Sequence, residues 1–135
     1  KAIVKDGEGA TKFIQIDVVG AGSNNDAARI ARAIADSPLV KTAINGCDPN
    51  WGRIISAAGY AGVDLDEAKI NLYINDILIF SKGMPAKCDM NLLSKSMKRS
   101  EINIRLELGL GSYADTVWTC DLSHEYVTIN AEYHT

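Results

Sequence analysis

Near the start of the sequence, a carboxylate between two glycines is the first group that could bind a ligand. Gly7 and Gly9 flank Glu8 within residues 6–12. Because glycine has no β-carbon, the backbone can approach a ligand closely here and leave the Glu8 carboxylate unobstructed. A carboxylate placed in this way suits a substrate ammonium group, although a solvated turn explains the same residues. The run is not a phosphate-binding loop, since it has no Gly-Lys-Ser/Thr ending and no helical periodicity follows it.

A second candidate lies in the middle of the chain, in residues 48–53. Trp51 and Arg53 could form a stacking or carboxylate-binding site. A helix start explains the segment equally well, with Asp48 as its cap and Pro49 at the first helical position, where proline's missing N–H costs nothing. A tryptophan is also more often part of a core than a ligand contact. Both interpretations stay open on these residues alone.

The C-terminal run, residues 129–135, is the third candidate. Asn130 and Thr135 offer hydrogen-bonding groups there, whereas a frayed tail is the commoner structure for such an end. Ser123 and His124 are neighbours in sequence, but a catalytic triad is assembled by tertiary geometry and not by adjacency. None of these runs identifies a reaction by itself.

The composition restricts the class of protein that could carry these groups. The chain has 135 residues, of which 47% are hydrophobic and 23% are charged, as is typical of one globular domain. Its formal net charge is −3. The densest basic group, Lys95, Lys98 and Arg99, is typical of a solvated helix end. A nucleic-acid partner or an anionic membrane surface is therefore disfavoured.

The cysteines and histidines predict neither disulfides nor a metal site. Cys47, Cys88 and Cys120 lie far apart with no Cys-x-x-Cys pair, which favours reduced thiols in a cytoplasmic protein. His124 and His134 do not match the spacing of metal ligands on a helix. We also expect no membrane span and no signal peptide, because the sequence has no long apolar run and no such pattern at its start.

Alternation and capping patterns predict the elements in the first half of the chain. A strand with one apolar face is expected over 13–19, and a glycine-rich break then leads to a helix over 27–34. Ser37 and Pro38 are expected to end that helix, because proline lacks a backbone donor and disfavours helical geometry just before it. A second helix is expected over 48–59.

The second half predicts mainly strands. Residues 69–80 have strand signals, with Asn75 and Asp76 as a hairpin turn. The other expected elements are a short helix from Asp89, a strand over 101–108 and a strand through Val117 and Cys120. The spacing in the last segment, 122–133, favours a helix, whereas Val127 and Thr128 favour a strand. These elements predict one α+β domain over residues 1–135, with a mixed or antiparallel sheet and about three helices. A joint between two lobes is suggested at 83–88.

Four runs occur in the order found in a known family. Residues 3–12, 37–43, 48–53 and 129–135 resemble the C-terminal portion of the ornithine acetyltransferases, also called glutamate N-acetyltransferases, and the resemblance spans the chain from end to end. It implies that the sequence is the C-terminal part of the second (beta) chain of a larger self-processing acyltransferase. The absence of an initiator Met at Lys1 agrees with this expectation, and we expect the C-terminus to be natural.

The resemblance implies a reaction and its partners. In this family a precursor cleaves itself before a threonine, which becomes the N-terminal nucleophile of the second chain. That threonine takes an acetyl group from N2-acetylornithine and passes it to glutamate in a ping-pong cycle of arginine biosynthesis. The expected partners are these two substrates and the upstream alpha chain, in a heterotetramer of two alpha and two beta chains. No cofactor is expected, and the use of acetyl-CoA as a further acetyl donor stays open. The expected location is the cytoplasm, or the mitochondrial matrix or a plastid in a eukaryote.

The resemblance also assigns roles to particular residues. The nucleophilic threonine would lie upstream of this sequence, so we expect no catalytic residue in the chain and no activity from the chain alone. Substrate binding carries over instead, with Glu8 holding the substrate amino group and with Asn130 and Thr135 closing over the amino-acid moiety. Residues 48–53 would then cap a helix beneath the site. An acyltransferase of secondary metabolism, a peptidase of related fold and a non-catalytic amino-acid-binding module are the alternatives.

Overall fold

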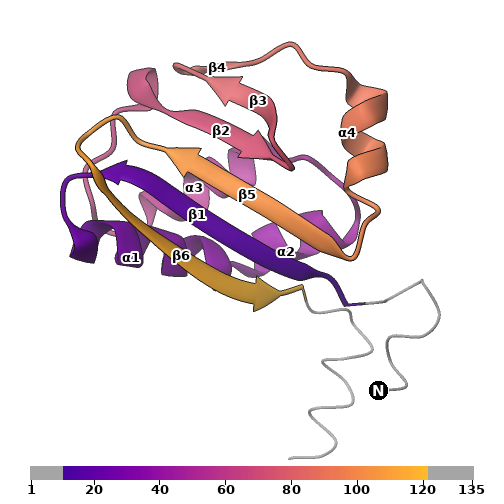
Figure 1. Cartoon of the computed structure of the whole chain (residues 1–135), viewed down its shortest axis with the longest axis horizontal. Coiled ribbons are helices and arrows are strands. Elements are labelled where there is room, and N and C mark those ends of the chain that lie inside the picture. The colour runs from indigo at the N-terminus through magenta and orange to yellow at the C-terminus, as the bar shows by residue number, and fades with distance from the viewer. Residues whose placement is uncertain (1–10, 122–135) are drawn as a thin grey trace, which may run out of the picture.

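The computed structural model describes residues 11–121, which form one sheet with helices packed mainly on one face (Figure 1). Within that range the six strands are ordered β4-β3-β2-β5-β1-β6. The strands are β1 (Phe13–Ala21), β2 (Asn71–Ile74), β3 (Ile77–Ser81), β4 (Met84–Pro85), β5 (Glu101–Glu107) and β6 (Tyr113–Cys120). The helices are α1 (Asn24–Ala35), α2 (Pro38–Asn45), α3 (Trp51–Gly59) and α4 (Met90–Ser96), with a short 3-10 helix, η2 (Glu67–Lys69). In Figure 1, α1, α2 and α3 lie behind the sheet and α4 stands to one side.

The pairing of the strands makes the sheet mixed. β1 lies parallel to β5 and antiparallel to β6, and the other pairs are antiparallel. The predicted α+β class with such a sheet is therefore confirmed. This order also brings the first and the last strand of the described chain together, with Phe13 opposite Cys120.

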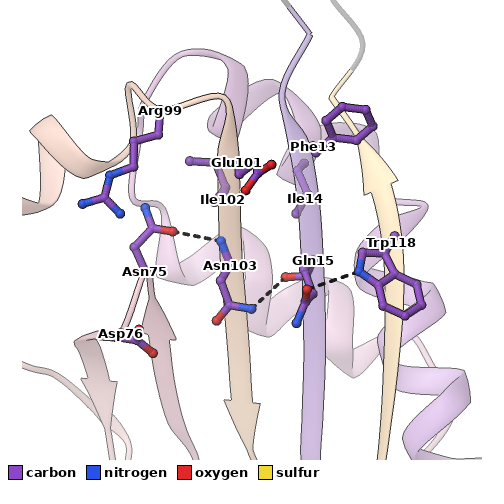
Figure 2. Close-up of a pocket in the computed structure, with 10 residues that line it drawn as sticks. All are labelled: Phe13, Ile14, Gln15, Asn75, Asp76, Arg99, Glu101, Ile102, Asn103 and Trp118. Atoms are coloured by element: carbon purple, nitrogen blue, oxygen red, sulfur yellow. Dashed lines mark hydrogen bonds between the residues drawn. The ribbon is translucent and has the colours of Figure 1, made fainter.

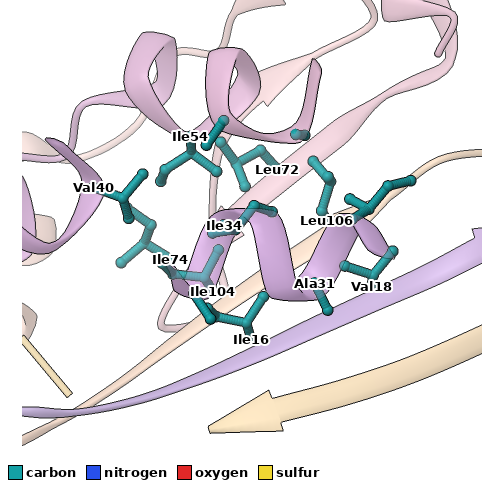
Figure 3. Close-up of a cluster of buried hydrophobic side chains, with 14 of the residues drawn as sticks. Ile16, Val18, Ala31, Ile34, Val40, Ile54, Leu72, Ile74, Ile104 and Leu106 are labelled. Carbon is teal, nitrogen blue, oxygen red and sulfur yellow. The ribbon is translucent and has the colours of Figure 1, made fainter. Parts of the chain in front are cut away.

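The core lies between the sheet and α1, α2 and α3 (Figure 3). β1 and β5 alternate as predicted, so that every second side chain points to the helices. Ile16, Ile104 and Leu106 are fully buried there and share one cluster with Ile34 of α1. Burying such a side chain contributes about 1.5–3 kcal/mol. This apolar face therefore decides on which side of the sheet the helices pack.

One helix, α2, was not expected from the sequence, and it raises the number of α-helices in the described residues to four. Ser37 and Pro38 do follow the end of α1, as predicted. They also begin α2, because the Ser37 side chain accepts a hydrogen bond from the Val40 N–H at 3.2 Å and Pro38 occupies the first turn. Proline is favoured at that place for the same reason that it ends a preceding helix, its missing N–H.

The predicted start of the next helix is wrong by two residues. Asn50, and not Asp48, caps α3, because the Asn50 side chain accepts from the Arg53 N–H at 3.0 Å. The Asp48 N–H instead donates to the Ala43 carbonyl at 2.8 Å and so closes the end of α2. Pro49 therefore lies in the connection and not at the first helical position. The last carbonyl groups of α2 need N–H donors, and the Asp48 N–H supplies one of them. No local pattern within 48–53 shows this requirement.

The hairpin predicted at Asn75 and Asp76 is confirmed. β2 and β3 pair antiparallel, and the two turn residues have φ values of 53° and 66°, as a type I′ turn requires. The Asn75 side chain also ties this turn to its surroundings. It donates to Ser96 Oγ at 3.0 Å and accepts from the Asn103 N–H at 2.9 Å.

The remaining predicted elements within the described residues are also confirmed. α4 follows Asp89, whose carboxylate accepts from the N–H groups of Asn91 and Leu92 at 3.0 and 3.1 Å. The two later strands are β5 and β6.

Two predictions about the elements of the fold are untested. Residues 84–85, within the suggested joint at 83–88, form β4 beside β3, and the joint itself stays a prediction. The segment 122–133 lies outside the described residues.

Among residues 11–121, no helix combines the length and the hydropathy that a membrane crossing needs.

Candidate functional site

The three candidate substrate-binding residues lie outside the described range: Glu8, Asn130 and Thr135. The structure does describe the residues that lead to them. Lys12 directly precedes β1 and Asp121 directly follows β6, and these neighbouring strands pair Phe13 with Cys120. The chain therefore enters and leaves the described region at one corner of the sheet (Figure 1).

A buried carboxylate fastens the two strands at this corner. Asp121 Oδ1 accepts from the Lys12 backbone N–H at 2.5 Å, and the Asp121 N–H donates to the Lys12 carbonyl at 3.2 Å. Asp121 Oδ2 accepts from Asn45 Nδ2 at 2.7 Å. The side chain of Asp121 is fully buried, and a buried carboxylate is tolerated only when its oxygens are hydrogen-bonded. Both oxygens of Asp121 meet this condition.

The Lys12 side chain runs into the protein from the same corner. Its Nζ donates to the carbonyl oxygens of Ile44 and Met97 at 2.9 and 2.8 Å and lies 3.1 Å from Cys47 Sγ. An ammonium group has three donors, and here each of them has an acceptor. Only 9% of Lys12 is exposed, so its charge is not offered to a ligand.

These four residues, Lys12, Asn45, Cys47 and Asp121, form what we call the corner cluster. They join β1, the end of α2 and the end of β6. Sequence analysis did not identify the cluster. One signal was present: Lys12 is in phase with Ile14 and Ile16 of the strand, so alternation alone places a lysine on the buried face.

The outer face of the sheet carries a second polar group, beside an open pocket of about 460 Å³. Asp17 accepts from Gln15 Nε2 at 3.1 Å, from Asn103 Nδ2 at 2.9 Å and from Thr116 Oγ1 at 2.8 Å. We call Gln15, Asp17, Asn103 and Thr116 the outer-face network. Figure 2 shows that Trp118 also donates to the Gln15 side chain, at 3.2 Å. Gln15 and Asn103, which line this pocket, are thus hydrogen-bonded to neighbouring side chains.

The electrostatics of this face also favour a structural role. Partial burial would raise the pKa of Asp17, but the hydrogen bonds from Asn103, Thr116 and Gln15 and the nearby Arg105 charge outweigh it and lower the pKa below its usual 3.8. Asp17 is therefore ionised at neutral pH and acts as an acceptor, not as a general acid.

Arg105 is held beside that network. Its guanidinium lies 4.1 Å from the centre of the Tyr73 ring, 3.1 Å from Asp76 Oδ1 and 3.4 Å from Glu107 Oε2. Partial burial would lower the pKa of Arg105, but these carboxylates and the hydrogen bonds raise it.

The structure does not bring Trp51 and Arg53 together as one binding site. The Trp51 ring stacks on Phe80 with centroids 5.0 Å apart. Arg53 points to α2, where its Nη1 donates to the Leu39 carbonyl at 3.2 Å beside a largely apolar pocket of about 580 Å³. Both side chains have intramolecular partners, which supports a structural role for residues 48–53.

The described residues contain no group of three or more His, Cys, Asp and Glu side chains that could hold a metal ion. The three cysteines are free thiols. Within residues 11–121, every buried side-chain nitrogen and oxygen has a hydrogen-bond partner. The corner cluster is therefore best described as a structural link between β1, α2 and β6.

Comparison with known proteins identifies the relatives of this chain. It is 49% identical over 137 residues to the arginine biosynthesis bifunctional protein ArgJ of Pseudomonas fluorescens (strain Pf0-1), and 50% identical over 135 residues to that of Dehalococcoides mccartyi (strain CBDB1). These matches cover 100% of this chain but only 34% and 33% of the relatives. The chain therefore spans about a third of the length of the curated relatives that it matches.

A solved structure agrees with this result. The fold matches the crystal structure of the arginine biosynthesis bifunctional protein ArgJ from Bacillus halodurans with a TM-score of 0.87 and 40% identity, over 98% of this chain and 63% of that one. The model of the ArgJ family matches residues 1–135. The resemblance found in the sequence is thus confirmed, and the chain belongs to the ArgJ family.

Proposed function

We propose that this chain is the substrate-binding part of an acetyltransferase that moves an acetyl group from N2-acetylornithine to glutamate in arginine biosynthesis. Membership of the ArgJ family supports the reaction class. One structural observation supports the site: the corner cluster ties the segment that leads to Glu8 to the segment that leads to Asn130 and Thr135.

Chain geometry limits how far this corner can be from Glu8. Glu8 precedes Lys12 by four positions, so its Cα lies at most about 14 Å from that of Lys12, at about 3.6 Å per extended residue. Lys12 cannot swing, because its backbone and its Nζ are both hydrogen-bonded in the interior. The fixed position of Lys12 therefore supports a binding site near this corner, within reach of Glu8.

The chemistry assigned to the chain is binding and orientation. The Glu8 carboxylate would accept charge-assisted hydrogen bonds from the substrate ammonium group. Asn130 and Thr135 would hold the rest of the amino-acid moiety, and so place the acyl carbon against the nucleophile. The nucleophile is a threonine from the upstream part of the precursor. It carries the acetyl group as an ester between the two half-reactions, so that one difficult transfer becomes two easier ones.

The upstream part of the precursor is the proposed partner of the chain, in an assembly of two alpha and two beta chains in the cytoplasm. The outer face of the sheet supports a covering partner. Phe13 and Trp118 lie at its rim with 66% and 69% of their surface exposed. Large apolar side chains that gather on one face are typical of a surface that another part of a protein covers.

The test of the proposed function is Glu8→Gln in the complete protein. Glutamine keeps the shape of the side chain but removes its charge. We expect kcat/KM for N2-acetylornithine and for glutamate to fall roughly tenfold to hundredfold, as for the loss of a charged hydrogen bond of about 1.5–3 kcal/mol. Self-cleavage of the precursor should persist, since no amino-acid substrate takes part in it.

Glu67→Gln is the matched control, because Glu67 is exposed in η2 and lies far from the corner cluster. The strand that follows η2 begins at Asn71, which pairs with Glu107 at the end of β5. The corner cluster lies at the opposite end of β5, where Phe13 pairs with Glu101. Glu67→Gln should leave both half-reactions unchanged. Unaltered kinetics in a fully processed Glu8→Gln protein would assign the glycine-flanked loop to structure and remove the support for this site.

A further inference from the structure

Cys47 occupies a backbone position that normally belongs to glycine. It follows the cap of α2 with φ 57°, in the left-handed region. Its N–H donates to the Ile44 carbonyl at 3.1 Å, and the next residue, Asp48, donates to the Ala43 carbonyl at 2.8 Å. These two bonds form the motif in which glycine is preferred, because a β-carbon is strained at this φ. A cysteine there implies a use for its side chain, since the backbone alone would favour glycine.

The Cys47 sulfur lies beside an amine that the protein holds still. Sγ is 3.1 Å from Lys12 Nζ and 3.4 Å from the Met97 carbonyl oxygen. Nζ is fixed from two other sides by the carbonyls of Ile44 and Met97. Lys12 as a whole residue is 9% exposed, whereas Cys47 is partly exposed. A small oxidant can therefore enter beside the sulfur, where the nitrogen is also within its reach at 3.1 Å from Sγ.

The other two cysteines lack this arrangement within the described residues. The sulfur of Cys88 contacts Met90 Sδ at 3.7 Å. Cys120 pairs with Phe13 in the sheet, so it belongs to the outer face, whereas the Lys12 side chain runs to the inner one. Reaction with a nearby amine is thus specific to Cys47.

We propose that Lys12 and Cys47 form a covalent cross-link, Nζ–O–Sγ, when the protein meets a peroxide. One inserted oxygen atom suits the gap of 3.1 Å between nitrogen and sulfur. A direct nitrogen–sulfur bond would be shorter and would pull Nζ away from the two carbonyls that hold it. The cross-link would join the start of β1 to the end of α2.

The chemistry balances with two molecules of hydrogen peroxide. The Cys47 thiol attacks the first peroxide, so that a sulfur–oxygen bond forms, the oxygen–oxygen bond breaks, and water leaves a sulfenic acid. The Lys12 amine, after releasing its proton to solvent, reduces the second peroxide and becomes a hydroxylamine with loss of another water. The hydroxylamine oxygen then displaces water from the sulfenic sulfur. The amine and the thiol are oxidised, both peroxides are reduced, and three waters result.

The test uses mass spectrometry on the complete protein after treatment with hydrogen peroxide. Free thiols are alkylated, and the protein is digested at acidic residues so that no cut depends on lysine. We expect one joined species that contains Lys12 and Cys47, heavier than the two peptides together by one oxygen atom less two hydrogen atoms. Dithiothreitol should separate it. Cys47 recovered only as alkylated thiol, as sulfinic acid or as a link without the added oxygen would overturn the proposal.

Variants make the assignment specific. Cys47→Gly suits the left-handed backbone position and removes the whole side chain, including the sulfur, so this variant should fold and should yield no joined species. The matched controls Cys88→Ser and Cys120→Ser should form it as the unchanged protein does. A joined species that persists in Cys47→Gly, or that disappears in Cys120→Ser, would refute the pairing. The mass measurement on the unchanged protein is independent of acetyltransferase activity, so it stands apart from the proposed function.

Discussion

The corner cluster and the outer-face network both use a carboxylate to tie neighbouring strands, but they do so in different surroundings. Asp121 is fully buried and accepts from the Lys12 N–H and from Asn45. Asp17 accepts from three side chains on the open face of the sheet, where it is only half-buried. Water can replace the partners of Asp17 but not those of Asp121. The same kind of hydrogen bond should therefore matter much more at the corner.

The largest effect is expected from Asp121→Ala. Removing this carboxylate leaves the buried Lys12 N–H and the Asn45 amide without their acceptor, so the free energy of unfolding should fall by about 2–4 kcal/mol. Thermal or denaturant unfolding of the complete protein measures this loss. The control is Asp64→Ala, which removes an exposed carboxylate and should change the stability little. Equal stability of the two variants would show that the corner cluster does not hold the strands together.

A smaller effect, visible mainly in acid, is expected from Asp17. Because its pKa is lower in the folded protein than in the unfolded chain, the folded state binds fewer protons there. The stabilisation is present above the ordinary pKa of a carboxyl group and is lost as the pH falls through the lowered value. Melting curves from about pH 5 to pH 2 should therefore drop more steeply for the unchanged protein than for Asp17→Asn. Parallel curves would contradict a role for the ionised carboxylate.

The smallest effect is expected where the outer face meets solvent, at Arg105 and Asp76. Their ion pair has 30% and 83% of its side-chain surface exposed, and exposed pairs contribute about 0–1 kcal/mol. A double-mutant cycle with Arg105→Gln and Asp76→Asn should give a coupling energy in that range. The coupling should shrink as salt is added, since salt screens exposed charges. A larger coupling that salt does not change would place this pair with the buried interactions of the corner.

Much of the fold followed from local pattern alone. The alternation in residues 13–19 and 101–108, the hairpin turn at Asn75 and Asp76, and the start of a helix at Asp89 are all confirmed. Each of these depends on residues close together in sequence. Side-chain period and turn chemistry act at that range, so the sequence carries their signal directly.

Local pattern failed where two elements compete for the same residues. The run from Ser37 to Asp48 contains a whole helix, α2. The end of α2 uses the N–H of Asp48, the residue that was predicted to cap the next helix. The ordered runs of the sequence also identified the family, and they named Glu8, Asn130 and Thr135 as candidates. Those three residues lie outside the described part of the chain, so their roles stay predictions.

The sequence by itself determined the class of fold, the family and the alternation that places Lys12 on the inner face of its strand. Only the tertiary structure decided which groups the Lys12 side chain contacts. Its partners at Ile44, Cys47 and Met97 lie between 32 and 85 positions away. Asp121 accepts a hydrogen bond from the backbone N–H of Lys12, which is 109 positions away in the sequence. Contacts between residues so distant in sequence arise when β6 pairs with β1 and α2 packs behind them, and no short-range pattern encodes that arrangement.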